Sequence, residues 1–138
     1  MVARFKSELC IDESRMFITG FSMGAIMTLT YACAKPATFR AIAPMSASLP
    51  STCTGTTPIA YWGSHGTNDP TISYASGQAV RDSFVARNGC TTQTTPGAQD
   101  GCVSYQGCDA PVNFCTFDGV HEPPPYAGVE LWAFFSQF

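Results

Sequence analysis

The fold is decided by residues 15–24, which read RMFITGFSMG. Residues 15–19 form a short apolar run that Gly20 interrupts, and Phe and Ile favour sheets, so the run predicts a buried strand. Residues 24–33 are rich in Ala, Met and Leu and predict a helix, with Pro36 just past its end. A strand therefore leads through a sharp turn directly into a helix.

The rest of the chain continues this alternation. Further strands are predicted at residues 40–45, 58–62, 103–106 and 112–117, although Pro44 weakens the first of them. Helices are predicted at 74–87, where Val80 and Phe84 are four apart, and at 130–138. Alternation of this kind favours an α/β layered fold with a mostly parallel sheet.

Composition narrows the class of protein. The chain has 138 residues, 45% of them hydrophobic, which suits a single compact domain over residues 1–138. Charged residues make up 12%, the net charge is −3 and no long basic run occurs, so nucleic-acid binding has little support. No apolar stretch approaches the ~20 residues that span a bilayer, so no membrane partner is expected. The sequence leaves the oligomeric state open.

The turn itself has the pattern Gly20-x-Ser22-x-Gly24, which is typical of the nucleophile turn of α/β-hydrolases. Such a turn lifts the serine hydroxyl clear of the sheet, and the two glycines are expected to avoid collisions with the neighbouring strand and helix. The following helix directs its free N–H groups at the reaction centre, so the Met23 N–H is a candidate oxyanion donor. Ser22 is therefore the candidate nucleophile.

A serine hydroxyl needs a base, and the chain has two histidines, His65 and His121. In α/β-hydrolases the order along the chain is Ser, acid, His. His121 lies late in the chain after a predicted strand, and no suitable acid precedes His65, so His121 is the preferred base. His65 is alternatively a turn residue that helps to shape the loop carrying the acid.

Asp69 is the preferred acid. It follows a predicted strand in a turn-forming loop, and sites of this fold are built where parallel strands end. Its role would be to fix the tautomer of the imidazole and to stabilise the imidazolium. The alternatives are a mid-helix residue, two residues in cysteine-rich loops and one that caps a strand end: Asp82, Asp100, Asp109 and Asp118.

These motifs together resemble fungal feruloyl esterases, secreted carbohydrate esterases related to acetylxylan esterases and polyhydroxybutyrate depolymerases. The resemblance rests on residues 9–12 (LCID), 17–24 (FITGFSMG), 62–69 (WGSHGTND), 117–121 (FDGVH) and 132–138 (WAFFSQF), and it covers almost the whole chain. It implies the triad Ser22, Asp69 and His121, the same residues that the chemistry selects.

The resemblance also implies what this sequence lacks. The family domain is roughly twice as long as this chain, so the chain is expected to be the C-terminal portion of an α/β-hydrolase three-layer sandwich. The first strands and the second oxyanion donor would precede Met1. After the histidine, at the expected pocket rim, residues 122–125 (EPPP) depart from the family's His-Thr-Pro form.

Seven cysteines without zinc-ligand spacing indicate disulfides and an extracellular protein, although residues 1–6 lack the apolar core of a signal peptide. One hypothesis places Cys10 and Cys33 together, because a strand and the helix that returns beside it end at the same side of the sheet. Cys53 would then bond a cysteine upstream of Met1. The remaining pairs would be Cys102 with Cys115, across a predicted hairpin, and Cys90 with Cys108.

The implied activity is hydrolysis of feruloyl esters of plant cell-wall polysaccharide through an acyl-enzyme, without metal or organic cofactor. Phe21, Trp62 and Tyr126 are candidates for a phenolic acyl pocket, although aromatic residues usually serve packing. Acetylated polysaccharide or a polyester is the alternative substrate. An inactive carbohydrate- or protein-binding remnant is the alternative from another class.

Overall fold

The structure is a computed structural model that describes residues 2–138. Its elements follow one another in an alternating order: α1 (Val2–Glu8), a short 3₁₀ helix η1 (Glu13–Arg15), β1 (Phe17–Phe21), α2 (Met23–Ala34), β2 (Ala41–Met45), β3 (Ala60–Gly66), α3 (Tyr74–Arg87), β4 (Thr94–Pro96), β5 (Cys102–Tyr105), β6 (Val112–Phe117) and α4 (Ala127–Phe135).

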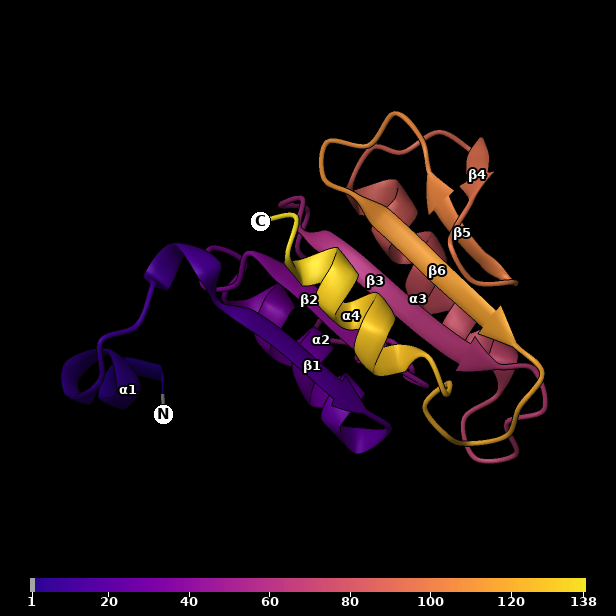
Figure 1. Ribbon diagram of the computed structural model, residues 1–138, viewed down its shortest axis with the longest axis horizontal. Helices are drawn as coiled ribbons and strands as arrows, with labels where there is room; N and C mark the ends of the chain where they lie inside the picture. Colours follow the sequence, from indigo (N-terminus) through magenta and orange to yellow (C-terminus); the bar gives the residue numbers. More distant parts are fainter. Residues whose placement is uncertain (1) are drawn as a thin grey trace.

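One six-stranded sheet organises the molecule, with the strand order β1-β2-β3-β6-β5-β4. The first four strands of that order are parallel, and β5 and β4 add two antiparallel pairings at one edge. Helices α2 and α3 cover one face and α4 covers the other, which makes three layers (Figure 1). The predicted α/β architecture with a mostly parallel sheet is confirmed.

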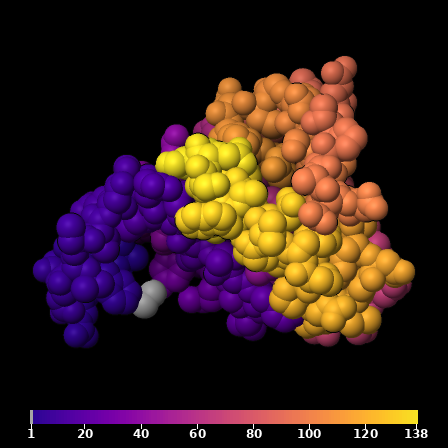
Figure 2. Space-filling model, viewed as in Figure 1, coloured from indigo at the N-terminus to yellow at the C-terminus, as the bar shows by residue number. Residues whose placement is uncertain are grey.

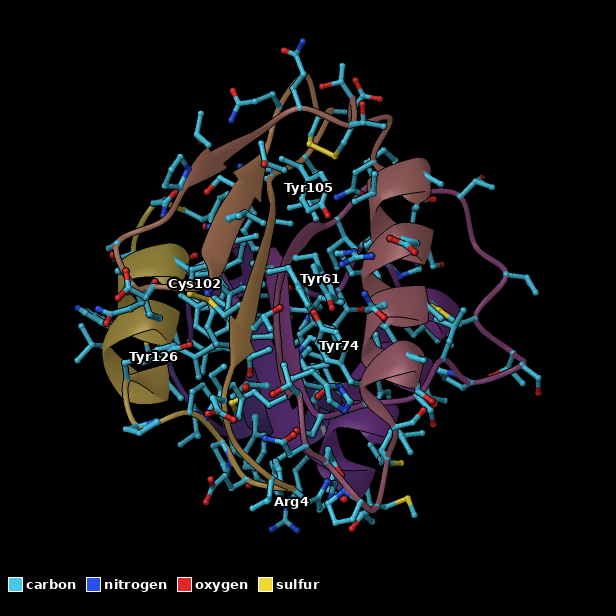
Figure 3. All side chains as sticks on the ribbon, turned by 90° about the vertical axis from the view of Figure 1, so that its right-hand side faces the viewer. Arg4, Tyr61, Tyr74, Cys102, Tyr105 and Tyr126 are labelled. Carbon is cyan, nitrogen blue, oxygen red and sulfur yellow. A yellow bond between two sulfur atoms is a disulfide. The ribbon has the colours of Figure 1, made fainter. Side chains whose placement is uncertain are left out.

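The centre of the sheet is buried on both faces. Every residue of β2 and of β3 is buried. On the side of α2 and α3, Tyr61 stacks on Phe84 at a centroid distance of 4.5 Å, and Tyr61 and Tyr74 lie between the sheet and α3 (Figure 3). On the other face, Trp62 belongs to the cluster that includes Phe134 of α4. Strand β3 is thus held by a core cluster on each face of the sheet.

Two details of β2 and β3 differ from the sequence-based expectation. Strand β3 continues to Gly66 instead of ending at residue 62, because Gly63 serves packing: a Cβ there would lie 2.1 Å from the Tyr61 hydroxyl. Strand β2 keeps Pro44 inside the sheet. Its register with β3 pairs residues 41, 42 and 45 but not Pro44, which has no N–H to donate.

The two edges of the sheet were predicted less well. At one edge, the strand expected at residues 15–19 is β1, at residues 17–21, and the prediction that it is buried is wrong. Within residues 2–138 it pairs only with β2, and none of its residues is fully buried. At the other, the three residues of β4 are all exposed and carry no apolar pattern, so the strand was missed. Helix α1 was also missed, because none of its residues is buried; it projects from the body of the molecule (Figure 2).

Three disulfides are present, and two of them are the predicted pairs Cys90–Cys108 and Cys102–Cys115. The second bond joins β5 to β6 at directly opposed positions of the antiparallel ladder. Both bonds therefore brace the antiparallel end of the sheet.

The predicted pair Cys10–Cys33 is wrong. Cys33, near the end of α2, bonds Cys53 in the loop between β2 and β3. Cys10 lies before η1, not at the start of β1, and is exposed and free within residues 2–138. The intervening 3₁₀ helix breaks the geometry that was expected to bring it under the sheet, and Cys53 needs no partner outside the described residues.

Candidate active site

The candidate nucleophile Ser22 occupies the single residue between β1 and α2. Its backbone has φ 55° and ψ −119°, and a positive φ is uncommon for a residue with a side chain. Gly20 makes this turn possible, because a Cβ there would lie 2.3 Å from the Gly24 carbonyl carbon and oxygen. A Cβ on Gly24 itself would meet nothing within 4 Å, so the expected steric role of Gly24 is wrong.

Hydrogen bonds fix the backbone of this turn. The Ser22 N–H donates to the Met45 carbonyl at 3.0 Å, and the Ser22 carbonyl accepts the N–H groups of Ala25 and Ile26. The Met23 N–H, at the start of α2, has no hydrogen-bond acceptor among residues 2–138. A free N–H at a helix start beside the serine has the character of an oxyanion donor.

The candidate acid Asp69 lies on a turn that follows β3. The turn is tied to the end of β6 and to the loop after it, because the Thr67 N–H donates to the Phe117 carbonyl and the Asn68 N–H to the Gly119 carbonyl, both at 3.0 Å. These backbone bonds hold the acid turn against the loop that carries His121.

The Asp69 side chain is fully buried and accepts several hydrogen bonds. Oδ1 accepts the N–H groups of Thr71 at 2.8 Å and Ile72 at 2.9 Å, and Oδ2 accepts from His121 Nδ1 at 2.7 Å. Burial alone would raise the pKa of Asp69. The hydrogen bonds from His121, Ile72 and Thr71 and the charge of His121 outweigh it, so the pKa lies below its ordinary value. The carboxylate is therefore held in its ionised form.

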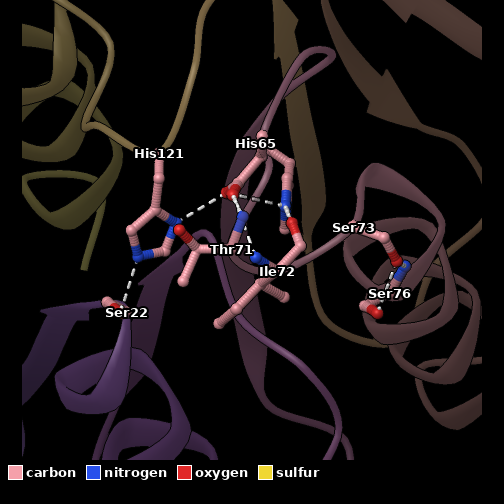
Figure 4. A network of polar contacts seen from close by, with 8 residues as sticks. Ser22, His65, Thr71, Ile72, Ser73, Ser76 and His121 are labelled. Carbon is pink, nitrogen blue, oxygen red and sulfur yellow. Dashed lines mark hydrogen bonds and ion pairs between the residues drawn. The ribbon is translucent and has the colours of Figure 1, made fainter.

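His121 joins the two other groups. Its Nε2 lies 2.8 Å from Ser22 Oγ while its Nδ1 faces the carboxylate, as the dashed contacts in Figure 4 show. The Phe21 ring lies 4.8 Å from the imidazole centroid and supports one side of it. This order of groups lets the imidazole accept the serine proton while an acid steadies its other nitrogen. The three residues expected from the sequence are thus within hydrogen-bonding distance.

The other candidate residues lie elsewhere. His65 is completely buried on the far side of the Asp69 carboxylate. Asp118 accepts from the Asn68 side chain at 2.7 Å, and Asp82 pairs with Arg81. Asp100 and Asp109 are exposed in loops. The backbone donors of residues 71 and 72 were not predicted, although an Asp-Pro-Thr stretch is a signal for such a turn.

Trp62, proposed for an acyl pocket, is buried in the core and 1% exposed. The cavity of about 200 Å³ that it lines contains no member of the Ser22 site. Tyr126 is half-buried beside Cys102, its hydroxyl 3.9 Å from the sulfur (Figure 3). The largest of three described cavities, about 780 Å³, includes residues 36–40 and 57–60 and no member of the Ser22 site.

Within residues 2–138, no group of three or more His, Cys, Asp or Glu side chains could hold a metal ion. No helix in the same range is long and apolar enough to cross a bilayer.

Known proteins were compared with the chain. It is 36% identical over 148 residues to a probable feruloyl esterase C from Aspergillus terreus, covering 99% of this chain and 55% of that protein. It is 37% identical over 147 residues to feruloyl esterase C from Emericella nidulans, covering 98% and 54%. The chain thus spans about half the length of the curated relatives it matches.

Solved structures agree on the fold. The acetyl xylan esterase from Aspergillus awamori superposes with a TM-score of 0.75 at 21% identity, covering 99% of this chain and 64% of that one. Residues 2–104 match the sequence family described as phospholipase/carboxylesterase. The sheet order, the strand–serine–helix turn and these matches together show that the chain is an α/β-hydrolase of the phospholipase/carboxylesterase family.

Proposed function

We propose that this chain hydrolyses carboxylic esters with Ser22 as the nucleophile, through an acyl-enzyme. The observation that carries the proposal is the continuous hydrogen-bond chain from Ser22 Oγ through His121 to Asp69, with distances of 2.8 Å and 2.7 Å. A serine becomes a useful nucleophile when a base held by a third group can take its proton.

In the first step, Ser22 Oγ attacks the ester carbonyl carbon and passes its proton to His121 Nε2. Asp69 Oδ2 stabilises the imidazolium that forms and accepts its Nδ1–H. The tetrahedral oxyanion lies near the start of α2, where the Met23 N–H donates to it. Collapse expels the alcohol, which takes the proton from His121, and leaves the acyl group on Ser22.

In the second step, His121 takes a proton from water, and the resulting hydroxide attacks the acyl carbonyl. The same oxyanion donor serves again, and Ser22 recovers its proton as the acid leaves. Every proton transfer passes through one nitrogen, His121 Nε2, which is why the 18% exposure of this side chain matters: it leaves a path for substrate and water.

The proposed substrate class is feruloyl esters of plant cell-wall polysaccharide. Its support is identity of 34–37% to several fungal proteins described as feruloyl esterases. The surface beside the nucleophile is also apolar: Met23 is 70% exposed and Val120, next to His121, is 50% exposed. An aromatic acyl group would cover these side chains on binding.

The proposed location is extracellular. Its support is the three disulfides, which persist in oxidising compartments and are rare in reducing ones.

The test is release of ferulate from methyl ferulate by the chain, by Ser22→Ala and by Ser7→Ala as a matched control on exposed α1. We expect Ser22→Ala to lower kcat by about 10⁴-fold or more and Ser7→Ala to match the unmodified chain. Equal release by all three proteins would refute the role of Ser22. If the chain hydrolysed acetyl esters in preference to methyl ferulate, and Ser22→Ala abolished that activity, only the proposed feruloyl specificity would be refuted.

A further inference from the structure

His65 is the second histidine of the chain, and the proposed mechanism does not use it. It lies near the carboxyl end of β3 with no exposed surface. Burying an imidazole is costly unless its nitrogens are bonded. Its contacts therefore indicate what it does.

The surroundings of His65 define its tautomer. Nε2 lies 2.8 Å from the Ile72 carbonyl oxygen, which can only accept, so Nε2 carries the hydrogen and donates. Nδ1 is buried without a hydrogen-bond partner among the described residues. Gly77 of α3 packs against it so closely that a Cβ would lie 2.1 Å from Nδ1. A hydrogen on Nδ1 would have no acceptor, so the contacts place the ring hydrogen on Nε2.

The group that His65 holds belongs to the acid turn. The carbonyl of Ile72 accepts from His65, while the N–H of Ile72 donates to Asp69 Oδ1 at 2.9 Å. His65 Nε2 also lies 3.3 Å from Asp69 Oδ2, the oxygen that accepts from His121. In Figure 4, the His65 and His121 side chains lie on opposite sides of the carboxylate oxygen that both rings contact.

We propose that His65 is a positioning residue that ties the end of the acid turn to β3 and thereby holds Asp69 Oδ2 toward His121. The inference rests on the proposed function, in which Asp69 is the acid. The beginning of the turn, at residues 67 and 68, is fixed by hydrogen bonds to the end of β6 and to the loop after it. At its end, the Nε2–H of His65 connects residue 72 to the strand and also faces the carboxylate.

Two substitutions separate this role from packing. In His65→Gln, the amide nitrogen lies near the position of Nε2 and can still donate to Ile72. In the matched control His65→Asn, the amide nitrogen lies near the position of Nδ1 and cannot reach it. We expect His65→Asn to lower kcat for methyl ferulate about 10²-fold, because a shift of about 1 Å at a catalytic group has that effect, with KM nearly unchanged. His65→Gln should stay within about threefold of the unmodified kcat.

A second readout needs no activity. Proton–nitrogen NMR of the unmodified chain should show His65 protonated on Nε2 and unprotonated on Nδ1. The Nδ1–H of His121 should give a downfield proton signal from its bond to Asp69, lost in His65→Asn and kept in His65→Gln. This signal tests the positioning even if the chain releases no ferulate, which separates failure of the inference from failure of the proposed function.

Three results would overturn the inference. One is a protonated Nδ1 on His65 in the unmodified chain, a measurement that holds even if the variants do not fold. The second is equal impairment of the Gln and Asn variants, which would leave only a packing role. The third is a His121 signal and a kcat in His65→Asn that match the unmodified chain.

Discussion

Strands β1 and β3 run in parallel and each presents one group of the site at its carboxyl end, but they are held in different ways. Strand β3 lies between β2 and β6, and all seven of its residues are buried. Strand β1 lies at the edge of the sheet, and Thr19 in its middle is exposed. Within residues 2–138, the candidate acid thus follows a strand with neighbours on both sides, and the candidate nucleophile follows a strand that is paired on one side.

The difference shows two ways to place a candidate catalytic group. Around Asp69 the backbone is fixed by hydrogen bonds, from the turn to the loop after β6 and from the turn to the carboxylate. At Ser22, one hydrogen bond to Met45 links the turn to the next strand. The conformation of the turn depends otherwise on the close packing of Gly20 against the Gly24 backbone. Polar substitutions should therefore matter most on the β3 side and steric ones on the β1 side.

The largest effect is expected from Asp69→Asn. The amide oxygen can still accept from Thr71 and Ile72, but the amide nitrogen then faces His121 and donates to Nδ1. The imidazole must carry its proton on Nε2 and cannot accept from Ser22, so kcat should fall by about 10⁴-fold with the fold retained.

Kinetics on methyl ferulate and a thermal melt would check this outcome. Asp118→Asn is the matched control, because the exposed Asp118 carboxylate bonds only the Asn68 side chain within residues 2–138. Activity of Asp69→Asn within tenfold of the unmodified chain would mean that the buried carboxylate is structural.

The next effect concerns the other end of β3. Asn88, completely buried after α3, accepts from the Ile59 N–H at 3.2 Å and donates to the carbonyls of Ile59 at 2.7 Å and Ala110 at 3.0 Å. Asn88→Leu leaves these three backbone groups unpaired, so the free energy of unfolding should fall by about 3–5 kcal/mol.

Urea unfolding would measure the change. Asn113→Leu is its control, because the half-buried Asn113 side chain makes no hydrogen bond within residues 2–138, and a loss below about 1 kcal/mol is expected. Comparable losses in the two variants would show that the Asn88 bonds contribute little.

The smallest effect compares the two glycines that flank Ser22. Gly20→Ala forces a Cβ against the Gly24 backbone and should lower the free energy of unfolding by about 1–3 kcal/mol. Gly24→Ala adds a Cβ in open space inside α2 and should raise it by up to about 1 kcal/mol through helix propensity. Chemical denaturation of both variants gives the comparison. The reverse order would contradict the assignment of the close contact to Gly20.

The sequence predicted the elements whose pattern reflects burial. Helix α3 was predicted at the residues it occupies, since Val80 and Phe84 are both in the core, and β6 was predicted likewise from Val112 and Phe114. What was missed lies at the surface, in α1 and β4, where no side chain is buried and no apolar period exists.

The site was predictable for a different reason. The nucleophile turn and the order Ser, acid, His restrict the choice to a few residues in a chain with two histidines. The groups that support the Asp69 carboxylate could not be predicted from the sequence. They are backbone N–H groups and His65 across a turn, and no pattern of side chains marks such contacts. The Cys33–Cys53 bond was missed because the path of a loop cannot be predicted from local residue propensities.

The contact between Ser22 and His121 joins residues 99 apart in the chain. Bringing the ends of such a loop together costs about 4 kcal/mol of chain entropy, which only the intervening strands can offset as they assemble. Local elements such as the β5–β6 hairpin need no such closure and should form sooner during refolding. The Ser22–His121 bond can exist only after the strands between them have docked, so its appearance marks the end of folding and its loss is an early sign that the sheet is opening.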